Sequence, residues 1–418
     1  MSFIADFHVH SRYSRATSKD MEVETLARWA LNKGIALLGT GDFTHPAYFA
    51  ELKAKLVAGG NGLFLLKNPP ESKDKQVHFI LTAEVNNIFT QGGKLRKIHT
   101  MLFAPTFQVA EEINAALAKR GNLHADGRPT FSFAVKDLVR IVRDISPDIL
   151  IVPAHVWTPW FSLFGANSGF DSIEECFEEE AGYIRVIETG LSSDPQMNWR
   201  LSALDEITLI SNSDAHSPSK IGREANVFDC ALDYYEIIEA LKTKNRNAFL
   251  YTIEFFPQEG KYHYDGHRNC GVLFSPAETK SHNYICPVCG RRLTVGVMHR
   301  VESLADRPEG FTPQDAIGAR HLVPLSEIIA EALSQGVNTK AVEGEYQRLI
   351  LHLGSELDML LNVPEEEIEK LASPRVSEGI RRVREARLQI VPGYDGVFGK
   401  INIFAEEEKK ETEQKELF

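Results

Sequence analysis

Seven short apolar segments, each followed by a stretch that can form a helix, lie between residues 3 and 211 of this chain. They are apolar throughout rather than alternating between apolar and polar residues, which is typical of parallel strands covered on both faces. This many strand–helix units favour a (β/α) barrel over an open sheet, and in such barrels the functional residues gather where strands end. The predicted strands are 3–8, 35–40, 77–85, 98–104, 149–155, 183–188 and 208–211.

Side chains that can bind a metal ion recur at or near the ends of these strands. His8 and His10 share one strand end and point the same way, because side chains alternate along a strand. A lone His or Glu at a strand end is usually solvated or hydrogen-bonded, but recurrence on every strand indicates one metal centre. The candidate ligands are His8, His10, Asp42, His45, Glu84, His99, His155, Glu188, Asp214 and His216.

The chemistry of this set predicts a metal-dependent phosphoesterase. Mixed His and carboxylate ligands suit two or three divalent ions of Zn²⁺, Mn²⁺ or Fe²⁺, and Mg²⁺ is a further candidate for activity. Neighbouring ions can stabilise both the attacking and the leaving oxygen of a phosphoryl transfer. Asp214 and Asp194 are the candidate catalytic residues. Asp194 precedes Pro195, so it either orients or protonates a reacting oxygen or caps a helix.

The motifs around these residues resemble the polymerase and histidinol phosphatase (PHP) family. The resemblance implies a distorted (β/α)7 barrel with three ions. One ion would be bound by His8, His10, Glu84 and Asp214; Glu84 would bridge to a second, bound by His99 and His155; His216 would help hold the third. The second motif reads TGDFTH rather than the family's TDH, so either Asp42 or His45 could serve there.

A small metal-binding module follows the predicted barrel. His267 and Cys270, then Cys286 and Cys289, have the spacing of a zinc ribbon that holds one structural Zn²⁺, with His263 as a rival to His267. We therefore predict a barrel over 1–257, a zinc ribbon over 258–300 and a helical DNA-binding domain over 301–403. We expect the remaining residues, 404–418, to form a disordered tail.

The net charge of −12 argues weakly against nucleic acid as a partner, but local basic clusters provide a route to it. A damaged base inside a duplex is reached by flipping it into a pocket, where Trp157 and Trp160 could stack, although a core role for either is open. The candidate DNA-binding residues are Lys97, Trp157, Trp160, Arg291, Arg292, Arg381, Arg382 and Arg384.

Five segments spread over nearly the whole chain resemble the endonuclease Q family: GTGDFTHP, TGLSSDP, KYHYDGHRNC, CPVCGRRL and PGYDGVFG. The resemblance implies cleavage of DNA 5′ to uracil, hypoxanthine, xanthine or an abasic site, leaving 3′-hydroxyl and 5′-phosphate ends. Two alternatives stay open. One is a small-molecule phosphatase resembling histidinol phosphatase, and the other is a non-catalytic DNA-bound scaffold.

The last five residues, QKELF, resemble the peptide by which bacterial enzymes dock on the sliding clamp, with Gln414, Leu417 and Phe418 as the contact residues. The chain has no apolar run near the roughly 20 residues that cross a bilayer, and its start lacks the pattern of a signal peptide. We therefore expect a cytoplasmic, nucleoid-associated protein without membrane contact.

Overall fold

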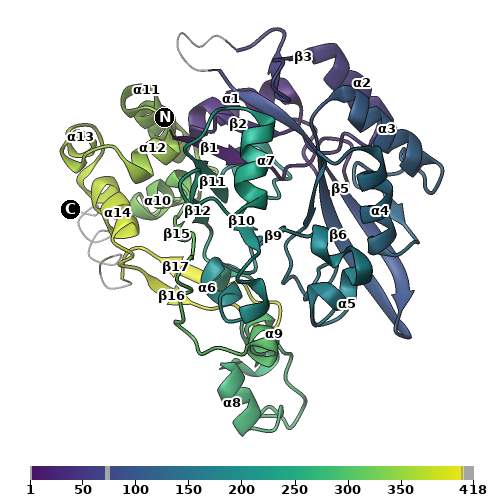
Figure 1. Cartoon of the computed structure of the whole chain (residues 1–418). Coiled ribbons are helices and arrows are strands. Elements are labelled where there is room, and N and C mark those ends of the chain that lie inside the picture. Colours follow the sequence, from purple (N-terminus) through teal and green to yellow (C-terminus); the bar gives the residue numbers. More distant parts are fainter. Residues whose placement is uncertain (1, 71–75, 406–407, 409–418) are drawn as a thin grey trace.

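The computed structural model describes residues 2–70, 76–405 and 408, and its fold is mixed α/β with a large central sheet (Figure 1). A strand forms in each of the seven segments predicted from the sequence. These strands are β1 (Phe3–Asp6), β2 (Leu37–Gly39), β5 (His78–Gln91), β6 (Lys94–Ala104), β8 (Leu150–Pro153), β9 (Val186–Glu188) and β10 (Thr208–Ile210).

The large sheet extends beyond these strands in both directions. Its hydrogen-bonded order is β15-β12-β11-β1-β2-β5-β4-β3, with β6 pairing with β5 and β8, and β7 with β5. The added strands are β3 (Leu56–Ala58), β4 (Phe64–Leu66), β7 (Thr130–Phe131), β11 (Ala225–Phe228), β12 (Phe249–Glu254) and β15 (Gly318–His321). β15 comes from the predicted C-terminal domain but pairs in parallel with β12, so that part of the chain shares the central sheet.

The expectation that all seven strands are parallel is wrong for β6, which runs antiparallel to β5 and to β8. Gly92 and Gly93 alone connect β5 to β6, and both have positive φ, as a tight hairpin turn requires. A two-residue connection cannot make a parallel crossover. The hairpin register pairs Asn86 with His99, so Glu84 and His99 lie on the same face.

Backbone hydrogen bonds outside the large sheet bring the remaining strand ends together. β9 and β10 form their own two-stranded parallel sheet. Val156 N–H donates to the Glu188 carbonyl at 3.0 Å, which joins the end of β8 to β9. His10 N–H donates to the Ala215 carbonyl at 3.0 Å, which joins the segment after β10 to the segment after β1. The ends of β1, β8, β9 and β10 therefore converge on one region.

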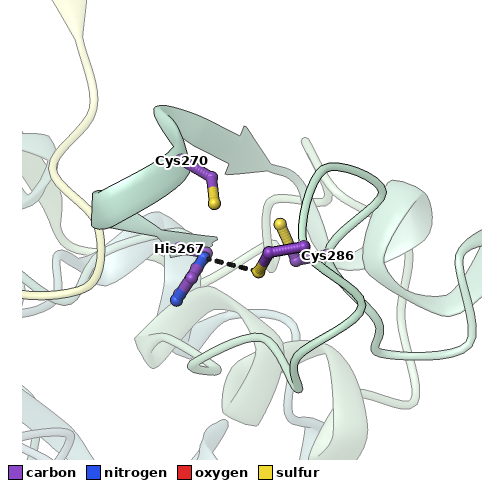
Figure 2. A group of neighbouring side chains, drawn as sticks. His267, Cys270 and Cys286 are labelled. Carbon is purple, nitrogen blue, oxygen red and sulfur yellow. Dashed lines mark hydrogen bonds between the residues drawn. The ribbon is translucent and has the colours of Figure 1, made fainter.

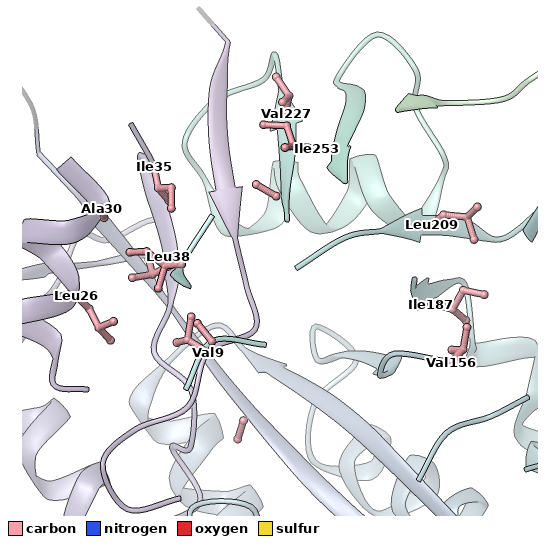
Figure 3. Close-up of a cluster of buried hydrophobic side chains, with 14 of the residues drawn as sticks. Val9, Leu26, Ala30, Ile35, Leu38, Val156, Ile187, Leu209, Val227 and Ile253 are labelled. Carbon is pink, nitrogen blue, oxygen red and sulfur yellow. The ribbon is translucent and has the colours of Figure 1, made fainter. Parts of the chain in front are cut away.

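Helices packed on the sheet complete a continuous apolar core (Figure 3). In α1, Leu26 and Ala30 are buried four residues apart, which is one face of a helix, and Leu38 of β2 belongs to the same core. Full burial of such a leucine contributes about 1.5–3 kcal/mol. The helices of this part are α1 (Val23–Lys33), α2 (Pro46–Lys55), α3 (Phe107–Ala118), α4 (Val135–Ile145), α5 (Ile173–Phe177), α6 (Pro195–Asn198) and α7 (Tyr234–Lys242).

The rest of the chain holds two short hairpins and a group of helices. The zinc-ribbon segment contributes β13 (Asp265–His267), β14 (Val272–Phe274), α8 (Pro276–Ser281) and α9 (Val297–Leu304), and β16 (Gln389–Val391) pairs with β17 (Lys400–Asn402). The C-terminal helices are α10 (Leu325–Ala332), α11 (Lys340–Leu353), α12 (Glu356–Leu361), α13 (Glu365–Leu371) and α14 (Pro374–Arg384).

The clamp-binding residues predicted in the tail, Gln414, Leu417 and Phe418, lie outside the described residues. Across the described ranges we find no helix with the length and apolarity that crossing a membrane requires.

Candidate metal centre

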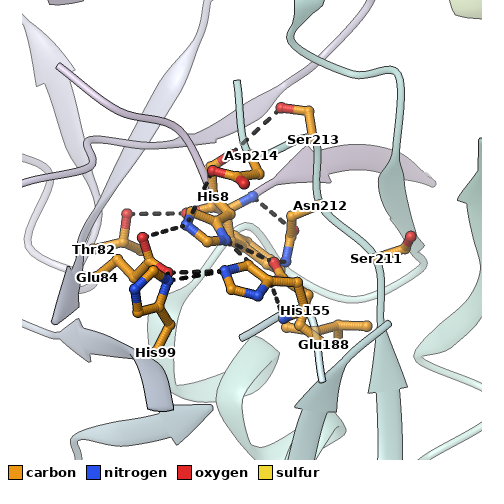
Figure 4. Close-up of polar contacts among 12 residues, drawn as sticks. His8, Thr82, Glu84, His99, His155, Glu188, Ser211, Asn212, Ser213 and Asp214 are labelled. Atoms are coloured by element: carbon orange, nitrogen blue, oxygen red, sulfur yellow. Dashed lines mark hydrogen bonds and ion pairs between the residues drawn. The ribbon is translucent and has the colours of Figure 1, made fainter. Parts of the chain in front are cut away.

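Three buried side chains form the first ligand group. One ligand atom from each of His8, His10 and Glu84 lies within 4.8 Å of the others, and none of the three residues is more than 2% exposed. His8 and His10 follow β1, and Glu84 projects from the middle of β5. Both histidines therefore lie beside Glu84, and Figure 4 shows His8 next to this carboxylate.

Two further carboxylates orient the histidines from the opposite side. Glu188 lies 3.0 Å from Nδ1 of His8, and Asp42 lies 3.0 Å from Nδ1 of His10. A carboxylate on Nδ1 fixes the proton there and leaves Nε2 as the metal-binding atom. In the described part of the chain, neither Asp42 nor Glu188 joins a group of three potential ligands. Their contacts favour an orienting role for both, whereas the sequence predicted ligands.

The atoms left facing inward fit a divalent cation. Nε2 of His10 lies 3.2 Å from Glu84 and 3.1 Å from Oδ1 of Asp214, but the angles do not make a hydrogen bond. Nε2 of His8 is likewise buried without a hydrogen-bond partner among the described residues. Burial would raise the pKa of Asp214, but His8 and His10 hold it well below its usual range. Buried polar atoms are rarely left unpaired unless an ion satisfies them.

The second ligand group shares Glu84 with the first. Oε1 of Glu84 lies 2.7 Å from Nδ1 of His99 and 3.0 Å from Nε2 of His155. Burial opposes ionisation of Glu84, but His99 and Arg128 outweigh it and hold the pKa of this carboxyl well below its usual range. Burial lowers the pKa of His99 to about 4, which keeps the imidazole neutral and able to donate a lone pair. An ionised Glu84 between two groups is suited to bridge two ions.

The third group has fewer ligands of its own. It contains His10, Asp214 and His216, as predicted for the last motif. Nε2 of His10 already faces the first group, and its Nδ1 is held by Asp42. Oδ1 of Asp214 also lies 3.1 Å from Nε2 of His10 and 3.6 Å from Nε2 of His8, so His216 alone is not shared with the first group. His45 instead accepts from Tyr48 N–H at the start of α2, and in the described residues it joins no ligand group. This group is therefore the one with the fewest ligands of its own.

Three residues of the centre have strained backbone conformations. Asp42, His155 and Asp214 have φ values of 45°, 32° and 47°, in the left-handed region that residues other than glycine seldom adopt. Each such conformation costs about 1–3 kcal/mol and persists only where the surroundings fix it. At Asp42, the backbone N–H and hydroxyl of Ser11 and the hydroxyl of Ser14 all donate to Oδ2. Strained backbone conformations concentrate at functional sites, so these three support a functional site at the ligand groups.

Arg128 contacts the centre without having been predicted. Its Nη1 donates to Oε2 of Glu84 at 2.9 Å from the loop before β7. Gly127 allows this loop to approach, because a Cβ there would lie 2.4 Å from Oδ2 of Asp42. This loop does not lie at the end of a predicted strand, so the strand pattern could not point to Arg128. The one sequence signal is the glycine directly before the arginine, which is typical of close packing. Arg128 partly neutralises a centre rich in carboxylates.

Asp194 is the N-cap of α6, one of the two roles weighed for it. Its Oδ1 accepts from Met197 N–H at 2.9 Å, and its Oδ2 lies 3.1 Å from Nε2 of His321 at the end of β15. Burial would lower the pKa of His321, but Asp194 outweighs it and raises the pKa above the ordinary value. Both carboxylate oxygens therefore have partners within the protein.

The zinc-ribbon residues converge as the sequence predicted. Ligand atoms of His267, Cys270, Cys286 and Cys289 all lie within 4.8 Å of one another, although the first two lie 16 or more residues from the others along the chain (Figure 2). Nδ1 of His267 lies 3.4 Å from Sγ of Cys289. His263 is not part of this group. One histidine and three cysteines suit a closed, tetrahedral Zn²⁺ site.

The two predicted base-stacking tryptophans differ in exposure. Trp157 is 1% exposed, donates from Nε1 to Asn198 at 2.8 Å and packs on Phe164, so its predicted DNA contact is wrong and it is a core residue. Trp160 is 46% exposed and lines a cavity of about 730 Å³. Only Trp160 is therefore available to a ligand.

The three arginines of α14 that were predicted to contact DNA all have partners within the protein, and the exposed Arg381 pairs with Glu378. Arg384 donates to the carbonyls of Met359, Leu360 and Val363, which end α12 and the turn after it. Arg382 is partly buried and pairs with Glu378 and Glu408. Arg384 is thus a structural residue, because these carbonyls have no partner within their own helix. Residues that remain at least partly exposed are Lys97, Arg291, Arg292 and Arg381.

The cavity beside Trp160 lies where three parts of the chain meet. Its walls combine loops of the N-terminal part, the segment around Tyr262 and the glycine-rich segment before β17. Trp160, Phe255, Tyr262 and Phe398 give it an aromatic lining. Thr158, another lining residue, has its hydroxyl 3.2 Å from Nδ1 of His155. The cavity is therefore adjacent to the metal centre.

A solved structure with the same architecture identifies the family. The crystal structure of the lesion-specific endonuclease PfuEndoQ from Pyrococcus furiosus matches with a TM-score of 0.85 and 31% identity, over 99% of both chains. The chain belongs to the endonuclease Q family. A second endonuclease Q structure, in complex with a 27-mer duplex substrate that has an abasic lesion at the active site, matches with a TM-score of 0.83 and 32% identity. That match covers 97% of this chain and 98% of the other.

A family model and a sequence relative also match parts of this chain. Residues 324–387, which include α10 to α14, match the family model of the MJ0043 C-terminal domain. The protein MJ0043 of Methanocaldococcus jannaschii is 33% identical over 259 residues, which is 59% of this chain. The match spans 31% of the length of that relative.

Proposed function

We propose that this endonuclease Q family member is a metal-dependent DNA repair endonuclease. It hydrolyses the phosphodiester 5′ to a deaminated base (uracil, hypoxanthine or xanthine) or an abasic site, and leaves 3′-hydroxyl and 5′-phosphate ends. The observation that carries the proposal is the pair of ligand groups that share Glu84, next to a cavity with an aromatic lining. The abasic-lesion duplex at the active site of a family structure that matches nearly the whole chain supports DNA as the substrate.

The protein's own residues would prepare the centre for this reaction. His8, His10, Glu84 and Asp214 would hold one divalent ion, and Glu84, His99 and His155 a second. A third, weaker ion would be held by His216 together with the shared Asp214. When bound, such ions supply Lewis-acid stabilisation of the phosphoryl group and lower the pKa of water. Glu188 and Asp42 keep the imidazoles oriented. Arg128, 2.9 Å from Glu84, would add positive charge beside the reacting phosphate.

Asp194 fits a supporting role better than direct proton transfer. Its two carboxylate oxygens are engaged by Met197 N–H and by His321. We propose that this contact fixes the loop after β9, which holds Glu188 at one end and lines the cavity with Leu191 and Ser192. A direct catalytic role for Asp194 would require DNA binding to free one of these two carboxylate oxygens.

The cavity gives the extruded nucleotide a place beside the ligand groups. Its volume of about 730 Å³ exceeds that of a single base, and aromatic side chains can stack on any base because every base has a π-face. Of the predicted DNA contacts, we retain Trp160 for stacking and Lys97, Arg291, Arg292 and Arg381 for the phosphates. One structural Zn²⁺ would hold the module that forms one wall. Docking of the QKELF tail on a sliding clamp stays a prediction.

A nicking assay tests the proposal directly. Duplexes labelled at the 5′ end of one strand would carry cytosine, uracil, hypoxanthine or an abasic site at one position, with a simple phosphate monoester assayed in parallel. We expect a single nick at each lesion and none in the duplex with cytosine at that position. Hydrolysis of the monoester with no nicking of any duplex would favour a small-molecule phosphatase instead, and no hydrolysis of either would favour a scaffold.

A further inference from the structure

Arg223 links the metal centre to the cavity. Its Nε and Nη2 both donate to the carbonyl of Ser213, at 3.1 and 3.0 Å. Ser213 directly precedes Asp214, whose φ of 47° is one of the strained conformations of the centre. Two donors on one carbonyl fix the orientation of that peptide group. Arg223 therefore holds in place the turn that presents Asp214 to the ligand groups.

The same guanidinium lines the cavity. Arg223 is partly buried, and its guanidinium carbon lies 6.0 Å from the ring centre of Phe255, which also lines the cavity. An arginine has five N–H donors, and only Nε and Nη2 are used on Ser213. Among the described residues Nη1 has no hydrogen-bond acceptor, so its two N–H groups can meet a ligand. Lys220, the neighbouring cation in the lining, is instead paired with Glu327 at 3.1 Å.

A donor in this position distinguishes a deaminated base from its parent. Deamination replaces the exocyclic amino group of cytosine or adenine, a donor, with a carbonyl oxygen, an acceptor. Arg223 can only donate, so it favours the carbonyl and is unfavourable beside an amino group. A donor does not separate uracil from thymine, so this argument covers the choice between a damaged base and the base from which it arose.

We propose that Arg223 reads the carbonyl of a deaminated base in the cavity while it holds the Ser213–Asp214 turn, so that recognition of the base and presentation of a metal ligand depend on one side chain. This inference rests on the proposed function. It adds a specificity residue and a physical connection between lesion recognition and the metal centre. An abasic site offers no base to read, and its cleavage should depend on Arg223 only through the turn.

Single-turnover cleavage of the uracil, hypoxanthine and abasic duplexes tests the proposal. The main variant is Arg223→Lys, in which one ammonium can replace the contact with Ser213 but cannot hold the turn and a base carbonyl together. We expect cleavage at uracil and hypoxanthine to fall roughly 10- to 100-fold more than cleavage at the abasic site. Arg223→Met should reduce all three and keep the same order. The matched control is Arg246→Met, at an exposed arginine that pairs with Asp315 and does not line the cavity.

The outcomes are distinguishable from a failure of the proposed function. Equal loss on all three duplexes in both variants would show that Arg223 only positions the turn, and no loss would show that it does neither; each result would overturn the proposal. If Arg223→Met is inactive on every duplex, Arg223→Lys decides alone, since its cleavage of the abasic duplex demonstrates an intact centre. A wild-type protein that nicks none of the duplexes would refute the proposed function, irrespective of Arg223.

Discussion

Each imidazole of the first ligand group has one nitrogen held by a carboxylate and the other directed at Glu84. At residue scale, the nitrogen that each carboxylate holds decides which atoms are left to bind an ion. Glu188 contacts Nδ1 of His8 and also accepts from His155 N–H at 2.8 Å and from Asn212 Nδ2 at 2.9 Å. It therefore fixes residues of both ligand groups without facing the ion positions itself.

Removing this orienting carboxylate should weaken the centre without abolishing it. We expect Glu188→Ala to lower the affinity for divalent ions by about 10- to 100-fold, whereas Glu188→Gln, which keeps an acceptor for the Nδ1 proton of His8, should lose less. Competition with a chelator measures the affinity. Glu111→Ala, on an exposed glutamate of α3, is the control. Loss of metal in Glu188→Gln as complete as in Glu188→Ala would argue that Glu188 is a ligand.

The sequence predicted which side chains lie together in the candidate centre better than how each one is oriented, for a physical reason. Strand ends place His8, Glu84 and His155 in one region whatever the details of packing. Whether a carboxylate faces Nδ1 or Nε2 of a histidine depends on the side-chain rotamers and on backbone shifts of a few tenths of a nanometre. Asp42 and Glu188 were therefore predicted as ligands, and Arg128, on a loop without a pattern, was not predicted.

At the scale of single elements, β12 ends in a carboxyl group whose burial lowers the free energy of unfolding. Glu254 is fully buried, and its oxygens accept from the hydroxyls of Ser211 at 2.9 Å and Thr252 at 2.5 Å. Burial raises the pKa of Glu254 to about 8, although both hydrogen bonds act to lower it. A buried carboxyl with few compensating contacts holds its proton at neutral pH.

The raised pKa of Glu254 predicts a pH dependence of the free energy of unfolding. Below about pH 4.5 the carboxyl is protonated in both states, and between there and about pH 8 only the unfolded chain releases the proton. Stability should therefore fall as pH rises through this window, by up to about 1.4 kcal/mol per pH unit relative to Glu254→Gln. Urea unfolding of both proteins at pH 5, 6.5 and 8 measures the difference. A constant difference across this range would contradict the prediction.

The zinc-ribbon element predicts a separable metal site. Cys286→Ser should remove one zinc equivalent per chain and leave the barrel ions in place, because the two sites share no ligand. Elemental analysis of the purified protein measures the metal content. Cys230→Ser, a cysteine outside the group, is the matched control and should lose none. Retention of every zinc in Cys286→Ser would exclude this cysteine as a ligand.

Element type was predictable from apolar runs, but direction and breaks were not. β6 was expected to be parallel because its composition matches its neighbours, and only the Gly92–Gly93 turn shows that it is not. Within residues 339–361, α11 and α12 are separate helices because Gly354, with φ of 95°, ends the first. Leucines continue at helical spacing through this break, so periodicity alone could not detect it.

At the scale of the whole molecule, one buried ion pair joins the N-terminal part to the C-terminal helices. Lys33 at the end of α1 lies 2.7 Å from Glu356 at the start of α12, and both side chains are at most 4% exposed. Glu356 also accepts from Leu325 N–H at 3.1 Å and from the hydroxyl of Tyr346 at 2.8 Å. The start of α10 and the middle of α11 are therefore tied to the same carboxylate.

Breaking this pair should destabilise the molecule strongly. Lys33→Met leaves Glu356 buried without its cation, which costs about 3–5 kcal/mol, whereas Lys53→Met, at an exposed pair with Glu111, should cost less than about 1 kcal/mol. Urea unfolding at neutral pH measures both changes. Equal, small effects of the two substitutions would mean that the buried pair adds nothing to the attachment of the C-terminal helices.

The central claim is that the ligand groups sharing Glu84 cut DNA at a lesion. The most direct measurement is single-turnover nicking of a duplex with one uracil by metal-stripped protein, by the same protein reloaded with Mn²⁺, and by Glu84→Gln treated identically. We predict a nick 5′ to the uracil only after reloading, and a rate at least about 10³-fold lower in Glu84→Gln, since the lost ions supply several kcal/mol of transition-state stabilisation. Equal nicking by the stripped protein or by Glu84→Gln would contradict the account.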